Sequence, residues 1–348
     1  MEIKLTAVNR KKITVITATF NLIKGERQNV FVKMFKSVHA QTYPNIEHLI
    51  IDGGSKDGTL EFIEQINKKY GKKELRVISE PDKGITDATI KGYKNARGEY
   101  IILMCSDDYY LRNDALELLA NELEKEQADF VCADGWWLFC RVWKADLESF
   151  VSRHPFIIST MLGKKSLFDK YGHFDPSYEM LADYELMFRL LTNPAIKGAV
   201  VPQTLTVLRP GGFSQTKMDL FVKETVQIYQ KYFNPKCRLS TKDCKMLHWA
   251  KPTAKLYARI LRLETNPRIL NSIRKYHNKR ELFFYRRRIA FLSLMWNKLY
   301  YFLFRKHYFD RDTPALFLPS WLGHMCCWFI WKKENRHKFR AKYVRPQK

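Results

Sequence analysis

Tyr100-Ile101-Ile102-Leu103-Met104-Cys105-Ser106-Asp107-Asp108 is an apolar run that ends in two adjacent carboxylates. The pattern of residues 100–104 predicts a buried strand. Open α/β sheets bind their ligands at the carboxyl ends of strands, which is where Asp107 and Asp108 fall. Paired acids beside a hydroxyl suit a hard divalent cation, because such ions prefer oxygen ligands. The same pair also suits a solvated turn ahead of a helix, so the choice depends on the surrounding sequence.

Three units of strand and helix precede this stretch. Strands are predicted over residues 13–19, 46–51 and 75–79, and the first two are apolar enough to be covered on both faces. Helices are predicted from about residue 29 to 41 and up to about residue 96. This alternation predicts an α/β fold with a mostly parallel sheet and right-handed crossovers.

Polar residues follow each of these strands. They are Asn21, Asp52, Asp82-Lys83 and Asp107-Asp108. Because the carboxyl ends of parallel strands meet at one edge of a sheet, we expect these loops to line one site. Residues 52–59 contain three glycines, which let the backbone approach a ligand closely, but they match neither the dinucleotide motif nor the P-loop. Their composition fits a nucleotide site and a structural turn equally.

The charge of the chain is divided unevenly. The net charge is +24, yet residues 1–210 carry 29 basic and 28 acidic side chains, whereas residues 211–348 carry 31 and 8. We therefore expect a catalytic domain over residues 1–212 and a basic, helical region over 213–348. A hydrophobic content of 46% excludes a disordered chain. Seven cysteines without a CxxC pair, and no signal-peptide pattern in the first 20 residues, favour a reducing cytosol.

Five short motifs, in this order, resemble the family 2 glycosyltransferases. They are residues 17–21 (TATFN), 52–59 (DGGSKDGT), 81–88 (PDKGITDA), 98–100 (GEY) and 106–108 (SDD). The resemblance covers about residues 13–210, and the nearest branch is that of the bacterial colanic-acid and O-antigen transferases, which build surface polysaccharides. It implies a GT-A fold, a Rossmann-like nucleotide-sugar domain with a metal-binding DxD-type motif.

The resemblance also implies roles on the donor side of the site. The residues expected to bind the nucleotide sugar are Thr17, Thr19, Asn21, Asp52, Asp82, Lys83 and Asp107. Asp108 is expected to hold a divalent metal, Mn²⁺ or Mg²⁺, which offsets charge on the leaving nucleoside diphosphate. The motif here is Ser106-Asp107-Asp108, a variant of the DxD pattern. An acid that opens the glycine loop fits a uracil reader, which favours a UDP-sugar.

On the acceptor side, the resemblance implies that Asp183 is the general base. Asp183 opens a predicted helix after residues 168–176, which are expected to form a turn, and the same position also suits a simple helix cap. Glu185 is the fallback, although two residues on it points to another face of the helix. His154 is expected near the acceptor or the diphosphate, and it also fits a structural role. The tryptophans of residues 129–165 suit either sugar stacking or the core.

The basic region suggests a surface that meets anionic partners. Residues 215–280 are expected to form two or three helices, residues 289–304 and 315–331 are apolar and aromatic, and a polybasic tail follows. This pattern predicts that residues 283–348 dock on an anionic membrane surface. Packing of these segments on the catalytic domain is an alternative. Nucleic-acid binding is another, but it is not expected, because no RNA-binding motif is present.

The sequence therefore predicts an inverting glycosyltransferase that moves a hexosyl or N-acetylhexosaminyl group from a nucleotide-diphosphate sugar to a hydroxyl group. The expected acceptor is a glycan or a polyprenyl-diphosphate-linked acceptor in bacterial surface polysaccharide synthesis. The expected location is cytoplasmic, peripheral on the inner face of the cell membrane. The alternatives are a non-catalytic nucleotide-binding protein and a nucleic-acid-binding protein that uses its basic region.

Overall fold

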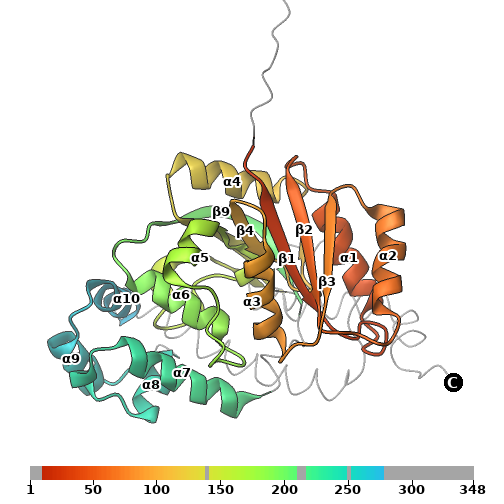
Figure 1. Cartoon of the computed structure of the whole chain (residues 1–348). Coiled ribbons are helices and arrows are strands. Elements are labelled where there is room, and N and C mark those ends of the chain that lie inside the picture. Colours follow the sequence, from red (N-terminus) through yellow and green to blue (C-terminus); the bar gives the residue numbers. More distant parts are fainter. Residues whose placement is uncertain (1–9, 138–140, 210–216, 249–251, 278–348) are drawn as a thin grey trace, which may run out of the picture.

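The computed structural model describes residues 10–137, 141–209, 217–248 and 252–277. Within them, one nine-stranded sheet has helices on both faces (Figure 1). The strands are β1 (Ile13–Thr19), β2 (Ile46–Asp52), β3 (Glu74–Ser79), β4 (Tyr100–Leu103), β5 (Tyr109–Tyr110), β6 (Phe130–Trp137), β7 (Arg141–Trp143), β8 (Leu162–Lys164) and β9 (Gly198–Leu208).

Ten α-helices lie in the described residues. They are α1 (Gln28–His39), α2 (Thr59–Tyr70), α3 (Ile85–Asn95), α4 (Ala115–Lys125), α5 (Lys165–Tyr171), α6 (Ala182–Thr192), α7 (Met218–Tyr232), α8 (Thr241–His248), α9 (Ala254–Leu263) and α10 (Pro267–His277). The 3-10 helices η1 (Leu147–Ser149), η2 (Ile158–Thr160) and η4 (Pro235–Cys237) lie in connections. None of the helices in this part of the chain is both long and apolar enough to cross a membrane.

The first four strands of the sheet are parallel, in the order β3-β2-β1-β4. In β1, Ile13 lies opposite Ile46 of β2 and opposite Tyr100 of β4. The predicted alternation is confirmed, with strand and helix ends within two residues of expectation. The loops after β1, β2, β3 and β4 consequently meet at one edge of the sheet.

The other half of the sheet is mixed, which the alternation did not predict. β8 is antiparallel to both β4 and β6, while β9 is parallel to β6. The two-residue strand β5 directly follows the acidic pair and is antiparallel to β9. This pairing fixes the turn that carries Asp107 and Asp108 between the ends of β4 and β9.

The sheet separates two hydrophobic cores. In β1, Ile13 and Val15 face the core under α1, α2 and α4, whereas Ile16 faces the core under α3, α5 and α6. The second core continues without a break into the C-terminal helices, where Ile228 of α7 and Ile273 of α10 belong to it. Figure 1 shows these helices beside α6, below the sheet.

The region after residue 217 forms four helices in its described part, rather than the two or three expected. Their apolar faces pack on the domain that carries the sheet, because α7 contacts α6 and α10 contacts both α6 and η1. The predictions for residues 283–348, including the membrane-docking surface, fall outside the described residues.

The turn expected over residues 168–176 is wrong in its first part, because Phe168 to Tyr171 form the end of α5. Leu167 and Phe168 are buried against β8 and α3, and this long-range packing favours the helix. The helix ends at Gly172, whose φ of 84° favours glycine.

Candidate active site

The acidic pair lies in the turn after β4. Asp108 is buried, with 1% of the residue exposed. Its carboxylate accepts hydrogen bonds from the hydroxyl of Ser159 and from the backbone N–H of Arg209, each at 3.1 Å. Ser159 belongs to η2 and Arg209 follows β9, so two segments from the mixed half of the sheet enclose the pair.

Burial disfavours the charged form of both carboxylates. Burial raises the pKa of Asp108 well above its usual value, and the charge of Asp107 raises it further. Burial also raises the pKa of Asp107, although Arg27 and Arg209 oppose this effect. A divalent cation would favour the ionised form of both groups, which is the opposite of what burial does.

The acidic pair fits a metal ion that is completed by substrate. Among the residues that the structure describes, no group of three or more His, Cys, Asp and Glu side chains could hold a metal by itself. Mg²⁺ is commonly held by one or two carboxylates together with water and substrate phosphates. Asp108, with Asp107 beside it, meets that requirement.

Asp183 lies in the first turn of α6, as predicted. Its side chain is 28% exposed, and its Oδ1 atom accepts a hydrogen bond from the backbone N–H of Tyr184 at 2.7 Å. The Nε2 atom of His154 is 4.0 Å from Oδ1, and the imidazole stacks on the ring of Tyr184 with centroids 4.4 Å apart. Burial lowers the pKa of His154 more than Asp183 raises it, so the imidazole is neutral near pH 7.

The acidic pair and Asp183 all influence the ionisation of Cys105. The pKa of this thiol is raised well above its usual value, first by burial and then by the carboxylates of Asp108, Asp107 and Asp183. Asp183 therefore acts on the same thiol as the acidic pair, although 75 residues separate it from Asp108 in sequence.

Asp52 organises the glycine-rich loop. Its buried carboxylate accepts hydrogen bonds from the backbone N–H groups of Gly54 (3.1 Å) and Ser55 (2.9 Å). The hydroxyls of Ser55 (2.5 Å) and Ser79 (2.7 Å) also donate to it. The Ser55 hydroxyl in turn accepts the backbone N–H of Asn21 at 2.7 Å. Asp52 thus ties together the ends of β1, β2 and β3.

Asp82 and Thr19 lie at the same edge of the sheet. A Cβ atom on Gly53 would lie 2.7 Å from Oδ2 of Asp82, so the close approach of the two loops needs glycine there. Asp82 accepts the N–H of Gly84 at 2.8 Å, and Lys83 is exposed. The Thr19 hydroxyl is buried and has no hydrogen-bond partner among the described residues. Such a group is costly unless a ligand or water pairs with it.

Thr17 does not face this edge. Its side chain is fully buried, and its hydroxyl lies 3.1 Å from Nε2 of His48 and donates to the sulfur of Met34 in α1. The hydroxyl is therefore used inside the core between β1 and α1. We leave Thr17 out of the donor site proposed below.

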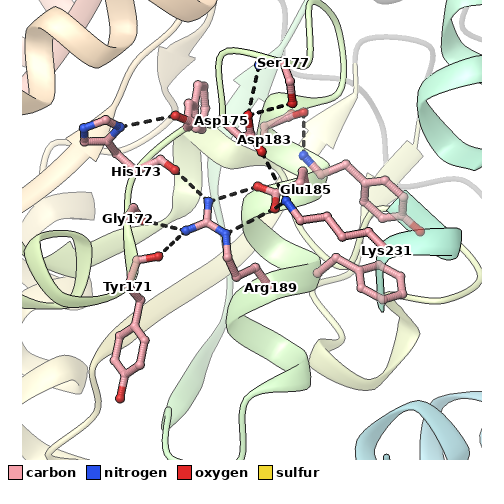
Figure 2. A network of polar contacts seen from close by, with 12 residues as sticks. Tyr171, Gly172, His173, Asp175, Ser177, Asp183, Glu185, Arg189 and Lys231 are labelled. Atoms are coloured by element: carbon pink, nitrogen blue, oxygen red, sulfur yellow. Dashed lines mark hydrogen bonds and ion pairs between the residues drawn. The ribbon is translucent and has the colours of Figure 1, made fainter. Parts of the chain in front are cut away.

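Glu185 is also turned away from Asp183. Its carboxylate is fully buried and accepts hydrogen bonds from Arg189 (2.9 and 3.2 Å), Lys231 (2.9 Å) and Tyr232, as Figure 2 shows for the first two. Burial alone would raise the pKa of Glu185, but these donors outweigh burial and hold the pKa below its usual value. As expected, the side chains of Asp183 and Glu185 point to different faces of α6. We do not assign Glu185 a proton-transfer role.

Two residues near the acidic pair were not singled out from the sequence. They are Ser159, which donates to Asp108, and Arg209, which is 4% exposed and whose Nη1 has no partner among the described residues. Arg209 directly follows β9, just as Asn21 comes soon after β1, so its position at a strand end was the available signal. Ser159 gave none, because its contact depends on the antiparallel return of β8.

Two solved structures share this architecture. They are residues 1–349 of S. aureus TarS in complex with UDP-GlcNAc (15% identity, 76% of this chain and 90% of that chain, TM-score 0.52) and the mannosyltransferase PcManGT from Pyrobaculum calidifontis in complex with GDP-Man and Mn²⁺ (16% identity, 78% and 71%, TM-score 0.52). The fold is therefore that of the GT-A glycosyltransferases.

Relatives found by sequence also carry glycosyltransferase names. A cholesterol galactosyltransferase of Borreliella burgdorferi is 30% identical over 39% of this chain and 36% of its own length. A PGL/p-HBAD biosynthesis glycosyltransferase of Mycobacterium tuberculosis is 26% identical over 53% of this chain and 73% of its own length. The chain thus spans only about a third of the first relative.

The sequence model of glycosyl transferase family 2 matches residues 14–181. Residues 14–181, 168 of the 348 residues of the chain, are thus similar to glycosyltransferase family 2, a family of glycosyl-transfer enzymes. The matched segment ends two residues before Asp183, so the expected base lies just outside it.

Proposed function

We propose that this protein transfers a sugar, with inversion, from a nucleotide-diphosphate sugar to a hydroxyl of a glycan acceptor. The observations that carry the proposal are the acidic pair Asp107–Asp108 in the turn after β4, with Asp108 buried, and the partly exposed carboxylate of Asp183 in the first turn of α6. An inverting transfer needs two separate carboxylate sites. One holds a metal ion beside the donor, and the other is exposed enough to take a proton from the acceptor.

The donor side of the proposal rests on the loops at the ends of β1 to β4. Thr19 offers a buried hydroxyl without a partner among the described residues, and Asn21, Asp52, Asp82 and Lys83 lie in loops at the same edge. TarS and PcManGT are recorded with UDP-GlcNAc and GDP-Man, which supports a nucleotide-sugar donor. A UDP-sugar remains our first choice, and Asp52, whose buried carboxylate accepts four hydrogen bonds, would shape the loop that meets the base.

Asp108 would hold the divalent metal, Mn²⁺ or Mg²⁺, and Asp107 would bind the ribose. When bound, the ion would offset the negative charge that forms on the nucleoside diphosphate. Arg209 supports the same role, because its buried guanidinium lowers the pKa of Asp107 and is close enough to act on the same charge.

Asp183 acts as the general base in this mechanism. Its carboxylate removes the proton from the acceptor hydroxyl while the hydroxyl oxygen forms a bond to the anomeric carbon. The bond between that carbon and the diphosphate oxygen breaks, and the electron pair leaves with the nucleoside diphosphate. Attack opposite the leaving group inverts the anomeric centre. The neutral His154, 4.0 Å away, borders Asp183 without neutralising it.

The proposal for the acceptor side rests on two tryptophan side chains. Trp143 donates from Nε1 to the backbone oxygen of His154 at 3.2 Å, and its ring meets Trp137 edge to face with centroids 6.2 Å apart. Half-buried indoles near Asp183 could stack on a sugar ring. The name of the Borreliella relative gives cholesterol as an acceptor, which supports a lipid acceptor here, and we favour a polyprenyl-diphosphate-linked glycan.

Two substitutions test the division of roles. Asp183→Asn should leave donor binding intact and abolish transfer, because it removes the base alone. Asp108→Ala should abolish the Mn²⁺-dependent part of donor binding. The measurements are transfer rates and donor titrations with and without Mn²⁺. Normal turnover by Asp183→Asn, or unchanged metal-dependent donor affinity in Asp108→Ala, would contradict the assignment.

The proposed location is the inner face of the cell membrane, with residues 283–348 as the docking surface. A flotation assay with anionic liposomes tests this part. The full chain should float with the liposomes, whereas residues 1–280 should stay at the bottom of the gradient. Equal behaviour of the two proteins would contradict docking by the basic tail.

A further inference from the structure

Helix α7 is hydrogen-bonded to the segment that leads into α6. Glu224 of α7 is 3% exposed, and its carboxylate accepts backbone N–H groups from three consecutive residues. They are Glu179 (2.8 Å), Met180 (3.0 Å) and Leu181 (2.7 Å). Leu181 is the N-cap of α6. The side chain of this N-cap is apolar and cannot accept a hydrogen bond from the N-terminus of α6. Glu224 supplies a hydrogen-bond acceptor there instead.

A second contact from α7 lies one helical turn further along α6. Lys231 donates to Glu185 at 2.9 Å and to Asp175 at 3.1 Å, and Tyr232 also donates to Glu185. Figure 2 shows Lys231 reaching across to Glu185, with Arg189 on the other side of the carboxylate. Arg189 in turn donates to the backbone oxygens of Tyr171, Gly172 and His173, which fixes the loop before α6.

Asp183 lies between these two contacts. Leu181 is held by Glu224 two residues before it, and Glu185 is held by Lys231 two residues after it. The backbone that carries Asp183 is thus fixed on both sides by α7, a helix that lies beyond the family match at residues 14–181. The carboxylates of Glu224 and Glu185 are both buried, so water competes little for these two acceptors.

We infer that Glu224 is a positioning residue for the transfer reaction, and that α7 is part of the catalytic unit. Glu224 does not touch the reacting atoms. It holds the N-terminal turn of α6 so that the carboxylate of Asp183 meets the acceptor hydroxyl in a productive geometry. This inference rests on the proposed function, because it presumes that Asp183 is the base. Small displacements of such a group are costly to the rate.

The chain offers a matched control for Glu224. Glu264, at the end of α9, is also a buried carboxylate that accepts three backbone N–H groups, those of Asn234 (2.8 Å), Thr265 (2.9 Å) and Asn266 (2.8 Å). Its partners lie in the connections around η4 and α10, not in the segment before α6. Glu224→Gln and Glu264→Gln therefore remove the same kind of interaction from two different places.

The experiment compares these two variants of the full chain. We expect Glu224→Gln to lower kcat on the order of tenfold to a hundredfold, with the KM for the donor unchanged. Hydrogen exchange at residues 179–184 should become faster in Glu224→Gln and stay unchanged in Glu264→Gln. Both variants should lose similar thermal stability, and Glu264→Gln should keep the kcat of the original chain. Equal kcat values in the two variants, or unchanged exchange at residues 179–184, would overturn the inference.

A second pair of variants covers the case in which Glu224→Gln does not fold. Lys231→Met removes the contact with Glu185 and Asp175, and Lys275→Met removes a lysine that also bridges two acids, Asp146 (2.9 Å) and Glu148 (2.6 Å). A fall in kcat is expected for Lys231→Met alone, and equal rates would again overturn the inference. Absence of transfer by the unsubstituted chain would instead contradict the proposed function, and it is recognised without any substitution.

Discussion

Asp108 is the residue at which stability and function are most clearly opposed. Its carboxylate is buried next to that of Asp107, and without a cation the two charges repel each other. The hydroxyl of Ser159, the backbone N–H of Arg209 and the side chain of Cys105 offset part of the cost of burying it. A buried charge without a full partner destabilises a fold, even where a ligand later needs it.

The substitution Asp108→Asn should therefore stabilise the metal-free protein. The amide keeps an acceptor for Ser159 or Arg209 and removes the charge. We expect the thermal midpoint to rise by about 2–4 °C, which corresponds to about 1 kcal/mol in a domain of this size. The measurement is thermal unfolding in EDTA. In the same variant, the stabilisation that a nucleotide with Mn²⁺ gives to the original chain should disappear. A lower midpoint in EDTA would contradict this account.

At the scale of elements, a chain of hydrogen bonds joins the α2–β3 connection to β1. The Nδ1 atom of His39 accepts the backbone N–H groups of Lys72 and Lys73, each at 3.0 Å. Its Nε2–H therefore donates to Nδ1 of His48 (3.2 Å), and Nε2–H of His48 donates to Thr17 (3.1 Å). Both imidazoles are neutral in this arrangement, and neither could gain a proton without losing a hydrogen bond.

This chain predicts a loss of stability in mild acid. Burial, with a contribution from Lys73, lowers the pKa of His39 to about 4, and burial followed by His39 lowers the pKa of His48 well below its usual value. The unfolded state binds these protons near pH 6.5, whereas the folded state does not. The contribution of these neutral imidazoles to the free energy of unfolding is therefore fully present above about pH 6.5 and is lost as the pH drops toward 4. At pH 5, the loss from His39 alone is about 2 kcal/mol.

Denaturant unfolding at pH 7.5 and pH 5 measures this effect. His39→Phe is a suitable variant, because His39 already stacks on Phe35 with centroids 4.0 Å apart. The variant should be less stable at pH 7.5, since two backbone N–H groups lose their acceptor, and its stability should depend less on pH. An unchanged dependence on pH would show that other groups cause the acid sensitivity.

At the scale of the whole molecule, the domain boundary expected at residue 212 divides one hydrophobic core. Phe188 of α6 meets Tyr229 and Phe233 with ring centroids 5.6 and 6.4 Å apart. Tyr229 and Phe233 lie beyond that boundary. Removing the C-terminal helices would expose this aromatic face of α6 to water, at a cost of roughly 1.5–3 kcal/mol for each large side chain.

We therefore expect residues 1–277 to unfold in one cooperative transition, and residues 1–212 to aggregate or to bind a hydrophobic dye. Calorimetry and dye binding on the two fragments provide the measurement. A soluble, cooperatively folded fragment of residues 1–212 would contradict the continuity of the core. The same fragment lacks α7, so any stable form of it should also lack transfer activity.

The sequence was most informative where neighbouring residues determine the structure. The strands up to β4 follow from β-branched and apolar runs, and the position of Asp183 in the first turn of α6 follows from its helical pattern. The mixed half of the sheet could not be predicted, because β8 is defined by its partners rather than by its three residues. Glu224 was likewise missed, since its partners lie more than 40 residues earlier and are backbone groups without a sequence signal.

The contact between Glu224 and the start of α6 has a consequence for the newly made protein. A chain emerges from the ribosome with its N-terminus first, so β1 to β4 and the loops at their ends are available well before α7. Residue 183 also emerges before residue 224, so the Glu224 carboxylate that binds the start of α6 is missing until α7 has left the exit tunnel. Under the proposed function, a nascent chain would thus acquire the donor loops first and a fixed Asp183 last.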